Sequence, residues 1–294
     1  MTGTGPRAAV LCIGAVHWDC IATARETPGP GADLPGRIVR RPGGVAYNVA
    51  RALTDRGVKA HLLAVLGDDA PGRELHAACA AGGLGTDGLI HLPDQPTDSY
   101  LAIEGPEGLV AAIADTATLD AGGSALRDAL GAFETPWTGP VVIDANLSEP
   151  VLADLLSSPA LAEAEICFAP ASPAKAERFR PWLGRSNTVF YLNRAEAAAL
   201  LRDPAVSTVD AARRLWNKGS ALVVVTDGAG PVAVAGPEGL RTQSPPKVRA
   251  RAVTGAGDTF LAAHIAARLD GADQTDALNT ALGHAAAHVA GDNS

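Results

Sequence analysis

The chain contains one stretch that decides its fold class: Ala8-Ala9-Val10-Leu11-Cys12-Ile13-Gly14-Ala15-Val16. This run has no charged residue. A strand with one exposed face alternates between apolar and polar residues, and this run does not. Strands that are buried on both faces belong mostly to parallel sheets, whose two sides are covered by helices. Residues 8–16 therefore predict a strand at the centre of an α/β fold.

The rest of the chain repeats this alternation of strands and helices. Further strands are expected at residues 59–67, 141–144, 165–169, 188–192 and 221–226, and helices at residues 45–57, 72–81, 194–201, 209–218, 258–269 and 272–289. A hairpin is expected near residues 231–241. Regular alternation of this kind predicts an open, mostly parallel sheet flanked by helices. Ligands of such sheets bind outside the carboxyl ends of the strands.

Two segments break the alternation. Residues 23–44 are rich in Pro, Gly and Arg, and residues 89–115 hold two short alternating runs joined by the turn at residues 104–108. Alternation on both sides of a turn that contains Gly is typical of a β-hairpin. We expect the two segments to form a small sheet that stands off the main body, inserted into a single domain of residues 1–294.

The composition excludes several kinds of partner. The 294 residues include 24 Lys and Arg and 32 Asp and Glu, which gives a net charge of −8. Because no cluster of basic residues is present, the chain is not expected to bind nucleic acid or a membrane surface. No apolar run approaches the roughly 18 residues of a membrane span, and the N-terminus lacks the features of a signal peptide. The four cysteines show no C-x-x-C spacing, which favours a reduced, cytoplasmic protein.

The motif with the clearest chemistry is Thr254-Gly255-Ala256-Gly257-Asp258-Thr259, which opens an alanine-rich helix. Its glycines allow a ligand to approach the backbone, and the free N–H groups at a helix start favour an anion. An anion hole of this kind suits a phosphoryl group in transfer, and Asp258 is placed to accept a proton from an attacking hydroxyl. On its own, the string fits a glycine turn with Asp258 as a cap residue at least as well.

Two other strings follow strands and suit a nucleotide and its metal ion. Asn193 and Glu196 are three residues apart and share a helix face, so together they suit a hydrated Mg²⁺. The string Thr226-Asp227-Gly228-Ala229-Gly230 offers a strand-end hydroxyl and a glycine turn to phosphates. Taken alone, the first pair is more often a helix cap with a first-turn Glu, and the second string a plain turn.

A fourth group of residues suits a sugar. Asp19 follows the first strand, and Gly43 and Gly44 precede a helix that carries Asn48. A carboxylate and a carboxamide bind hydroxyl groups, and the glycines leave room for the ligand. The alternative is that Asp19 caps the end of a strand and Asn48 is an ordinary helix residue.

In this order, the motifs resemble those of the PfkB, or ribokinase-like, carbohydrate kinases. The likeness also includes Leu66-Gly67-Asp68-Asp69 with Gly72, and it spans nearly the whole chain. It implies a Rossmann-type, mostly parallel sheet with a small β-sheet lid, built from the insertions near residues 23–44 and 89–115. It further implies ATP, Mg²⁺ and transfer of the γ-phosphoryl group to a sugar hydroxymethyl.

The resemblance assigns roles residue by residue. The implied catalytic group consists of Asp258 as general base, with Gly255, Ala256 and Gly257 as the anion hole. The implied sugar contacts are Asp19, Gly43, Gly44 and Asn48, with His17 where many relatives have Asn. The implied ATP contacts are Thr226, Gly228, Gly230 and Thr254, and the implied magnesium environment contains Asn193 and Glu196.

Within the family, the chain is similar to the pseudouridine kinases. Four strings carry this likeness, at residues 97–101, 112–115, 144–148 and 172–175. It implies phosphorylation of the 5′-hydroxyl of pseudouridine, with Ser99 and Ile113 among the substrate contacts and Lys175 near ATP. The alternative substrates are another nucleoside or a sugar such as ribose. A non-catalytic nucleoside sensor is a further alternative, because Ala169 replaces an acidic or amide residue common near the phosphates. Lids of this family can pair subunits, so a homodimer through the lid is a further expectation.

Overall fold

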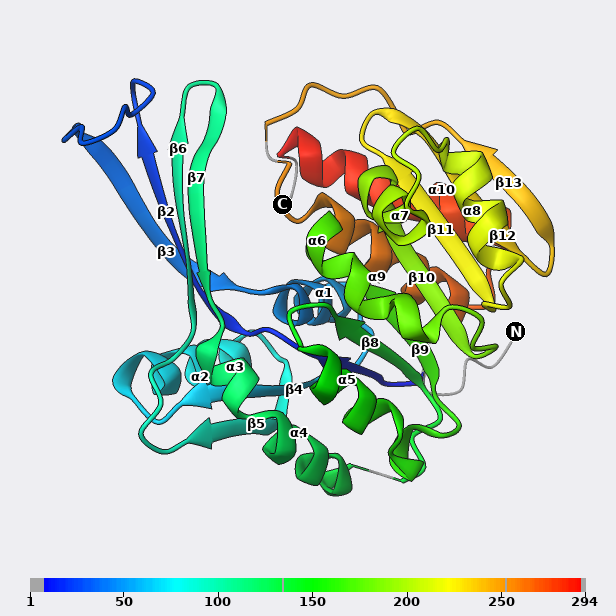
Figure 1. The fold of residues 1–294 in the computed structure, drawn as a ribbon, viewed down its shortest axis with the longest axis horizontal. Helices are drawn as coiled ribbons and strands as arrows, with labels where there is room; N and C mark the ends of the chain where they lie inside the picture. The colour runs from blue at the N-terminus through cyan, green and yellow to red at the C-terminus, as the bar shows by residue number, and fades with distance from the viewer. Residues whose placement is uncertain (1–7, 134, 252, 292–294) are drawn as a thin grey trace.

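A nine-stranded sheet forms the centre of the molecule (Figure 1). The structure, a computed structural model, describes residues 8–133, 135–251 and 253–291. The strands follow the order β13-β12-β11-β10-β9-β8-β1-β4-β5. Their bounds are β1 (Val10–Ile13), β4 (Ala60–Gly67), β5 (Gly85–Leu92), β8 (Pro140–Asp144), β9 (Glu165–Ala169), β10 (Thr188–Asn193), β11 (Leu222–Asp227), β12 (Gly230–Gly236) and β13 (Gly239–Gln243). Neighbours are parallel except in the β11–β12 and β12–β13 pairs. The predicted α/β class and mostly parallel sheet are confirmed.

The apolar run that predicted this fold lies between β4 and β8 as strand β1. Every residue of β1 is buried, and Cys12 pairs in parallel register with both Leu62 and Val142. Leu11 and Ile13 belong to one half of the core, whereas Cys12 belongs to the other half, across the sheet. A strand packed on both faces has no polar face, which explains why this run does not alternate.

Helices cover both faces of the large sheet. The core on the Leu11 side includes residues of α4 (Gly123–Ala129), α5 (Glu149–Leu156), α7 (Arg194–Leu201) and α8 (Thr208–Trp216). The core on the Cys12 side includes residues of α1 (Val45–Thr54), α2 (Ala70–Ala81), α9 (Ala256–Leu269) and α10 (Gln274–Ala290). Shorter helices are α3 (Ala117–Ala121), α6 (Pro173–Ala176), η1 (Leu130–Ala132), η2 (Pro159–Leu161) and η3 (Glu177–Trp182). A search of the described residues finds no helix with the length and apolar character needed to cross a membrane.

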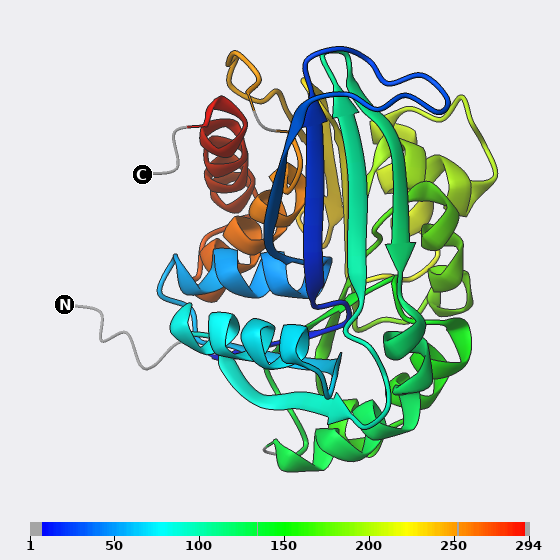
Figure 2. The ribbon, with the colours of Figure 1, turned by 90° about the vertical axis from the view of Figure 1, so that its left-hand side faces the viewer.

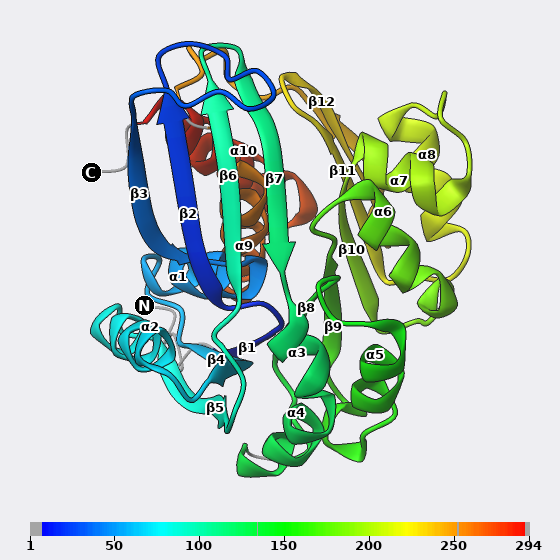
Figure 3. The same ribbon diagram turned by 60° about the vertical axis from the view of Figure 1, so that its left-hand side comes forward.

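A second, four-stranded sheet projects from one side of the body (Figures 1 and 3). Its order is β3 (Gly36–Gly43), β2 (His17–Ala24), β6 (Ser99–Gly105) and β7 (Gly108–Asp115), and Figure 2 views it face on. The expected insertion at residues 89–115 begins too early, because residues 89–92 belong to β5 of the large sheet. There Leu89 pairs with Ala64 in parallel register and is buried.

The segment that leads into β6 is fastened to the body by Asp69 and Thr97. The Thr97 hydroxyl donates to Oδ1 of Asp69 over 2.5 Å, and the backbone N–H of Thr97 donates to Oδ2 over 3.0 Å. The same hydroxyl accepts from the N–H of Gly67 over 3.2 Å. A Cβ at Gly67 would lie 2.4 Å from the carbonyl oxygen of Gln95. The Gly67 and Asp69 positions of the sequence motif therefore fix the base of the small sheet.

Candidate active site

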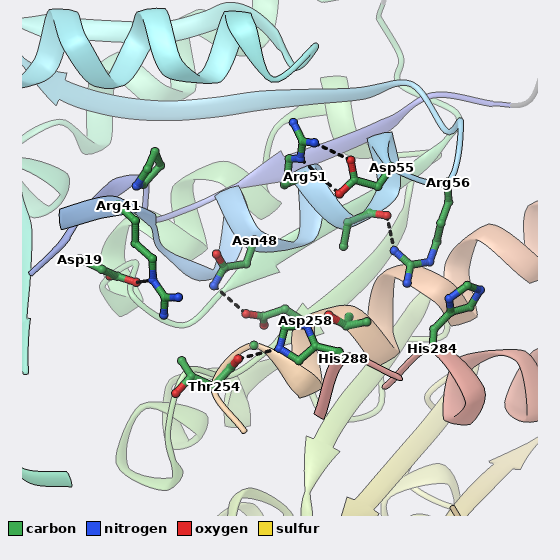
Figure 4. Close-up of a pocket in the computed structure, with 14 residues that line it drawn as sticks. Asp19, Arg41, Asn48, Arg51, Asp55, Arg56, Thr254, Asp258, His284 and His288 are labelled. Carbon is green, nitrogen blue, oxygen red and sulfur yellow. Dashed lines mark hydrogen bonds and ion pairs between the residues drawn. The ribbon is translucent and has the colours of Figure 1, made fainter. Parts of the chain in front are cut away.

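Asp258 lies in the first turn of α9, directly behind the glycine turn. Gly255 is the N-cap residue and has a φ of 83°, a left-handed conformation that favours glycine. The Oδ2 atom of Asp258 accepts a hydrogen bond of 2.9 Å from Nδ2 of Asn48, on α1 (Figure 4). Residues of α1 and α9 share the core on the Cys12 side of the sheet, so packing of the two helices brings these side chains together.

Two hollows meet at Asp258. The larger cleft has a volume of about 650 Å³, and its walls include Asp19, Arg41, Asn48 and Thr254 (Figure 4). The smaller cavity has a volume of about 100 Å³ and is lined by Ala169, Pro170, Tyr191, Leu192, Asn193, Glu196, Val224, Thr226, Gly257, Asp258, Phe260 and Leu261. Asp258 borders both hollows, so its carboxylate stands at their junction.

The electrostatics of this junction favour protonated carboxyl groups. The pKa of Asp258 is raised to about 6: burial raises it most, the Asn48 hydrogen bond lowers it, and the charges of Asp144 and Asp19 raise it. Burial also raises the pKa of Glu196 to about 7, with Asp258 adding to the effect. Crowded acidic groups of this kind are stabilised in their charged form by a nearby cation.

The expected sugar contacts Asp19 and Asn48 line the larger cleft. Asp19 is buried on β2, with Nδ1 of His17 3.3 Å and Nε of Arg41 3.8 Å from its two carboxylate oxygens. A Cβ at Gly43 would lie 2.3 Å from the carboxyl carbon of Asp19. Gly44 has a φ of 99°, and a Cβ there would lie 2.2 Å from a backbone oxygen. Gly43 therefore leaves room for the carboxylate of Asp19, and Gly44 lets the chain pass close to the backbone of Ala15.

Asn193 and Glu196 form a capping box at the start of α7. The side chain of Asn193 accepts from the N–H of Glu196 over 2.9 Å, and Oε2 of Glu196 accepts from the N–H of Asn193 over 2.7 Å. The structural interpretation of this pair is thus correct. Both residues also line the smaller cavity. The capping box holds both side chains at the cavity. It uses Oε2 of Glu196 and not Oε1.

The expected nucleotide contacts are only partly brought together. Thr226 lines the smaller cavity, whereas Gly228 and Gly230 lie in the β11–β12 turn and are not among its lining residues. Lys175 lines neither hollow. Its Nζ donates to Oδ1 of Asn146 over 2.6 Å, and burial lowers its pKa. Thr254 lines the larger cleft rather than the smaller cavity.

Two expected substrate contacts lie on the opposite face of the small sheet. In its register, Asp19 pairs with Tyr100, and Tyr100 pairs with Ala114. Because side chains alternate between faces, Ser99 and Ile113 point to the side away from Asp19. The register thus places Ser99 and Ile113 away from Asp19, whereas the adjacent residues Tyr100 and Ala114 share the face of Asp19.

Asp144, the first residue of the string at residues 144–148, lines neither hollow but raises the pKa of Asp258, an effect that the sequence pattern did not indicate. Its buried carboxylate accepts from the N–H groups of Ala15, Ala46 and Asn146, at 2.8, 3.2 and 2.8 Å. A Cβ at Gly14 would lie 2.3 Å from its carboxyl carbon. Asp144 thereby joins the ends of β1 and β8 to the start of α1. Its position at the carboxyl end of a buried strand was the available signal.

Comparisons with known proteins agree with this geometry. The model of the pfkB family carbohydrate kinases matches residues 7–292. The chain is 29% identical over 279 residues to the pseudouridine kinase of Escherichia coli strain K12, which covers 93% of this chain and 88% of that protein. A carbohydrate kinase from Agrobacterium tumefaciens has a TM-score of 0.75 at 29% identity, with 95% of this chain and 90% of that chain covered. The ribokinase of Thermotoga maritima shares the fold, with a TM-score of 0.79 at 18% identity and coverage of 96% and 93%. With its sheet, its glycine turn and this match over almost its full length, the chain belongs to the pfkB family of carbohydrate kinases.

Proposed function

We propose that this chain is an ATP- and Mg²⁺-dependent kinase that phosphorylates the 5′-hydroxyl of pseudouridine. The observation that carries the proposal is Asp258, which borders the larger cleft together with Asp19 and the smaller cavity together with Glu196. In-line transfer needs an acceptor site and a donor site that meet at a proton acceptor. The likeness to the Escherichia coli pseudouridine kinase supports the substrate class.

In the proposed reaction, Asp258 accepts the proton of the 5′-hydroxyl as the new O–P bond forms. The bond between the γ-phosphorus and the β,γ-bridging oxygen breaks, and ADP leaves. The Asn48 hydrogen bond holds the carboxylate in place from the side of α1. Since the pKa of Asp258 is about 6, it is mostly ionised at neutral pH and still basic enough to take up a proton.

The glycine turn has the shape expected of an anion hole. A Cβ at Gly257 would meet no atom within 4 Å, so the space in front of this backbone is open. The helix start lacks a hydrogen-bonding cap side chain. The N–H of Ala256 donates to the backbone oxygen of Val253 over 3.2 Å, so the N–H groups of Gly257 and Asp258 are the ones proposed to bind an anion. We place the transferred phosphoryl group at this point.

The smaller cavity suits the metal environment. The described ranges contain no cluster of three or more metal-binding side chains, and Mg²⁺ bound through water and phosphate oxygens needs few carboxylates. Glu196 fits this requirement, because it is a buried carboxyl group that lines the cavity, and its pKa is raised first by burial and then by the charge of Asp258. Bound there, the ion would neutralise charge on the phosphates. The side-chain oxygen of Asn193 accepts the N–H of Glu196 in the capping box, so Asn193 is proposed to hold Glu196 at the cavity.

The inner face of the small sheet supports a nucleoside as the acceptor. Beside the row that contains Asp19 and Tyr100, the next row on this face consists of Val39, Ile21, Ala102 and Ala112. Ala102 is buried, whereas Ala112 is exposed, and the small side chain of Ala112 is proposed to leave space for a flat base above the ribose. Tyr100 and Arg41 flank Asp19 on the two neighbouring strands and are proposed to bound this space.

A coupled assay of ADP release tests the proposal. Pseudouridine, uridine, adenosine, ribose and fructose are compared at fixed ATP and Mg²⁺, with the Asp258→Asn variant as the control. Turnover of pseudouridine that is lost in the variant is the expected result. Turnover of ribose or another nucleoside, but not of pseudouridine, would reject pseudouridine as the substrate and support the proposed kinase activity. If nothing is phosphorylated but a nucleoside binds, the chain is a sensor, the role that Ala169 leaves open.

We also propose a homodimer formed through the outer face of the small sheet. Ile38, Leu101 and Ile113 share this face by register and are 75%, 42% and 68% exposed. Neighbouring apolar side chains this exposed are typical of an interface. Sedimentation should give a dimer for the wild type and a monomer for Ile113→Lys. A monomeric wild type would exclude this part of the proposal.

A cytoplasmic location completes the proposal. All four cysteines are free, and Cys12, Cys79 and Cys167 are buried. Unpaired thiols persist in a reducing compartment.

A further inference from the structure

His288, on the last helix, contacts both ends of the glycine turn. Its Nε2 atom lies 2.8 Å from the backbone oxygen of Thr254, and its Nδ1 atom lies 3.4 Å from Oγ1 of Thr259 (Figure 4). The first residue precedes the turn, and the second lies in the first turn of α9. A single ring from α10 therefore spans the segment that includes Gly257 and Asp258.

Two backbone hydrogen bonds hold the turn from within, from the N–H of Ala256 to the oxygen of Val253 and from the N–H of Thr259 to the oxygen of Gly255, and no capping side chain adds to them. Gly255, the N-cap residue, has no side chain to cap α9. A second link to α10 lies just before the turn, where the N–H of Arg251 donates to the backbone oxygen of Val289 over 2.8 Å. A Cβ at Gly255 would lie 3.5 Å from the ring of His288, so the ring packs directly over this residue.

The contact with Thr254 fixes the proton on the ring. A backbone carbonyl only accepts hydrogen bonds, so Nε2 of His288 must donate. In the neutral ring Nδ1 is then an acceptor and can receive the hydroxyl hydrogen of Thr259. The ring thus joins a carbonyl before the turn to a hydroxyl behind it.

We propose that His288 is a positioning residue that holds the glycine turn, so that its N–H groups point at the transferred phosphoryl group. This inference rests on the proposed kinase function. His288 itself touches no reacting atom. Its loss should lower kcat, because the donors no longer match the transition state, while ground-state binding of the nucleoside at Asp19 stays intact.

Two substitutions separate the hydrogen bond from the bulk of the ring. In His288→Gln the amide nitrogen can take the position of Nε2 and still donate to Thr254, whereas His288→Leu cannot donate. We expect kcat to fall about 10- to 100-fold in His288→Leu, with the KM for the nucleoside changed by less than about twofold, and to recover most of this loss in His288→Gln. Asn279→Leu, at an exposed position of α10, is the matched control and should keep wild-type kcat.

Hydrogen exchange of the amides of residues 255–259 gives a readout independent of turnover. These amides should exchange faster in His288→Leu than in the wild type and in His288→Gln. If the wild type phosphorylates no acceptor, the proposed function fails while exchange still tests the anchor. Unchanged exchange in His288→Leu would overturn the inference, as would wild-type kcat in that variant or equal losses in the Leu and Gln variants.

Discussion

Asn48 donates a hydrogen bond of 2.9 Å to Asp258 from 210 positions away in the chain. The donor is on α1, which follows the Gly43-Gly44 pair, and the acceptor is on α9, which follows the glycine turn. The two glycine motifs of the sequence thus meet at one carboxylate. The packing of these two helices therefore determines where the carboxylate of Asp258 lies relative to the substrate hydroxyl.

Removal of this hydrogen bond should impair the base in a defined way. In Asn48→Ala, Asp258 loses a partner that favours its charged form, so its pKa should rise above the present value of about 6. We expect kcat/KM to fall about 10- to 100-fold at pH 7 and the acidic limb of the pH profile to move to higher pH. A pH series of the variant and the wild type measures both effects. An unmoved limb would separate Asn48 from the ionisation of Asp258.

The wild-type pH profile tests the role of Asp258 directly. A protonated carboxyl cannot accept a proton, so activity should be low below pH 6, rise through pH 6 and level off above about pH 7. An ordinary aspartate, with a pKa near 3.8, would keep activity down to about pH 4. Measuring kcat/KM for MgATP, which reports the ionisation of the free enzyme, from pH 4.5 to 8.5 distinguishes the two. Full activity at pH 4.5 would exclude a base with this raised pKa.

Gly257 allows a test of the anion hole that does not disturb the fold. A Cβ at this position meets no atom within 4 Å and φ is not positive, so Gly257→Ala should fold normally. Its methyl group would project into the space proposed for the phosphoryl group and lower kcat by about 100-fold. Gly283→Ala, also in a helix and with open space around it, is the control and should keep wild-type turnover. Equal kcat in both variants would place the phosphoryl group elsewhere.

The sequence predicts the structure best where the burial of a segment determines its own pattern of apolar residues. The run at residues 8–16 has to be apolar on both faces because β1 lies between β4 and β8 under two helix layers. The motif residues Asp258 and Asn48 were found separately, but their contact depends on the packing of α1 against α9 and has no local signal. For the same reason nothing in the pattern indicated His288, whose partner Thr254 is 34 positions away.

The pattern leaves register and sheet membership open. An alternating strand shows which residues share a face but not which face meets the site, so the pattern does not distinguish Ser99 and Ile113 from Tyr100 and Ala114, which face Asp19. Residues 89–92 read as part of a hairpin, yet they pair with β4, a strand more than twenty positions earlier. Asn193 and Glu196 illustrate a different point. A capping box and a site residue are compatible, because capping holds Glu196 at the cavity.

His264 should make the protein less stable in acid. It is 1% exposed, and burial together with Arg268 lowers its pKa to about 3. The unfolded chain takes up this proton near pH 6.5, whereas the folded chain does so only near pH 3, so stability is lost as pH falls below 6.5. At pH 5 the loss amounts to about 2 kcal/mol. Urea unfolding at pH 7.5 and pH 5 measures it.

The variant His264→Asn is the comparison for this measurement. It retains a polar group near Nδ1, which lies 2.9 Å from the Tyr191 hydroxyl, but it does not titrate. It should be less stable than the wild type at both pH values because the side chain is smaller. Its loss between pH 7.5 and pH 5 should be smaller by about 2 kcal/mol. An equal loss in both proteins would assign the acid sensitivity to other groups.

Thr97 offers a test of how the small sheet is fastened. Thr97→Val keeps the shape of the side chain but removes the hydroxyl that joins Asp69 to the N–H of Gly67. The carboxylate and the amide then each lose a partner, which should lower the free energy of unfolding by about 1 to 3 kcal/mol. Thr97→Ser retains the hydroxyl and should lose less than about 1 kcal/mol. Because β6 starts two residues later, the loosened base should also raise the KM for the nucleoside more than it lowers kcat. Urea unfolding and initial-rate kinetics on the three proteins decide the matter, and equal stability of the Val and Ser variants would show that the hydroxyl does not anchor the sheet.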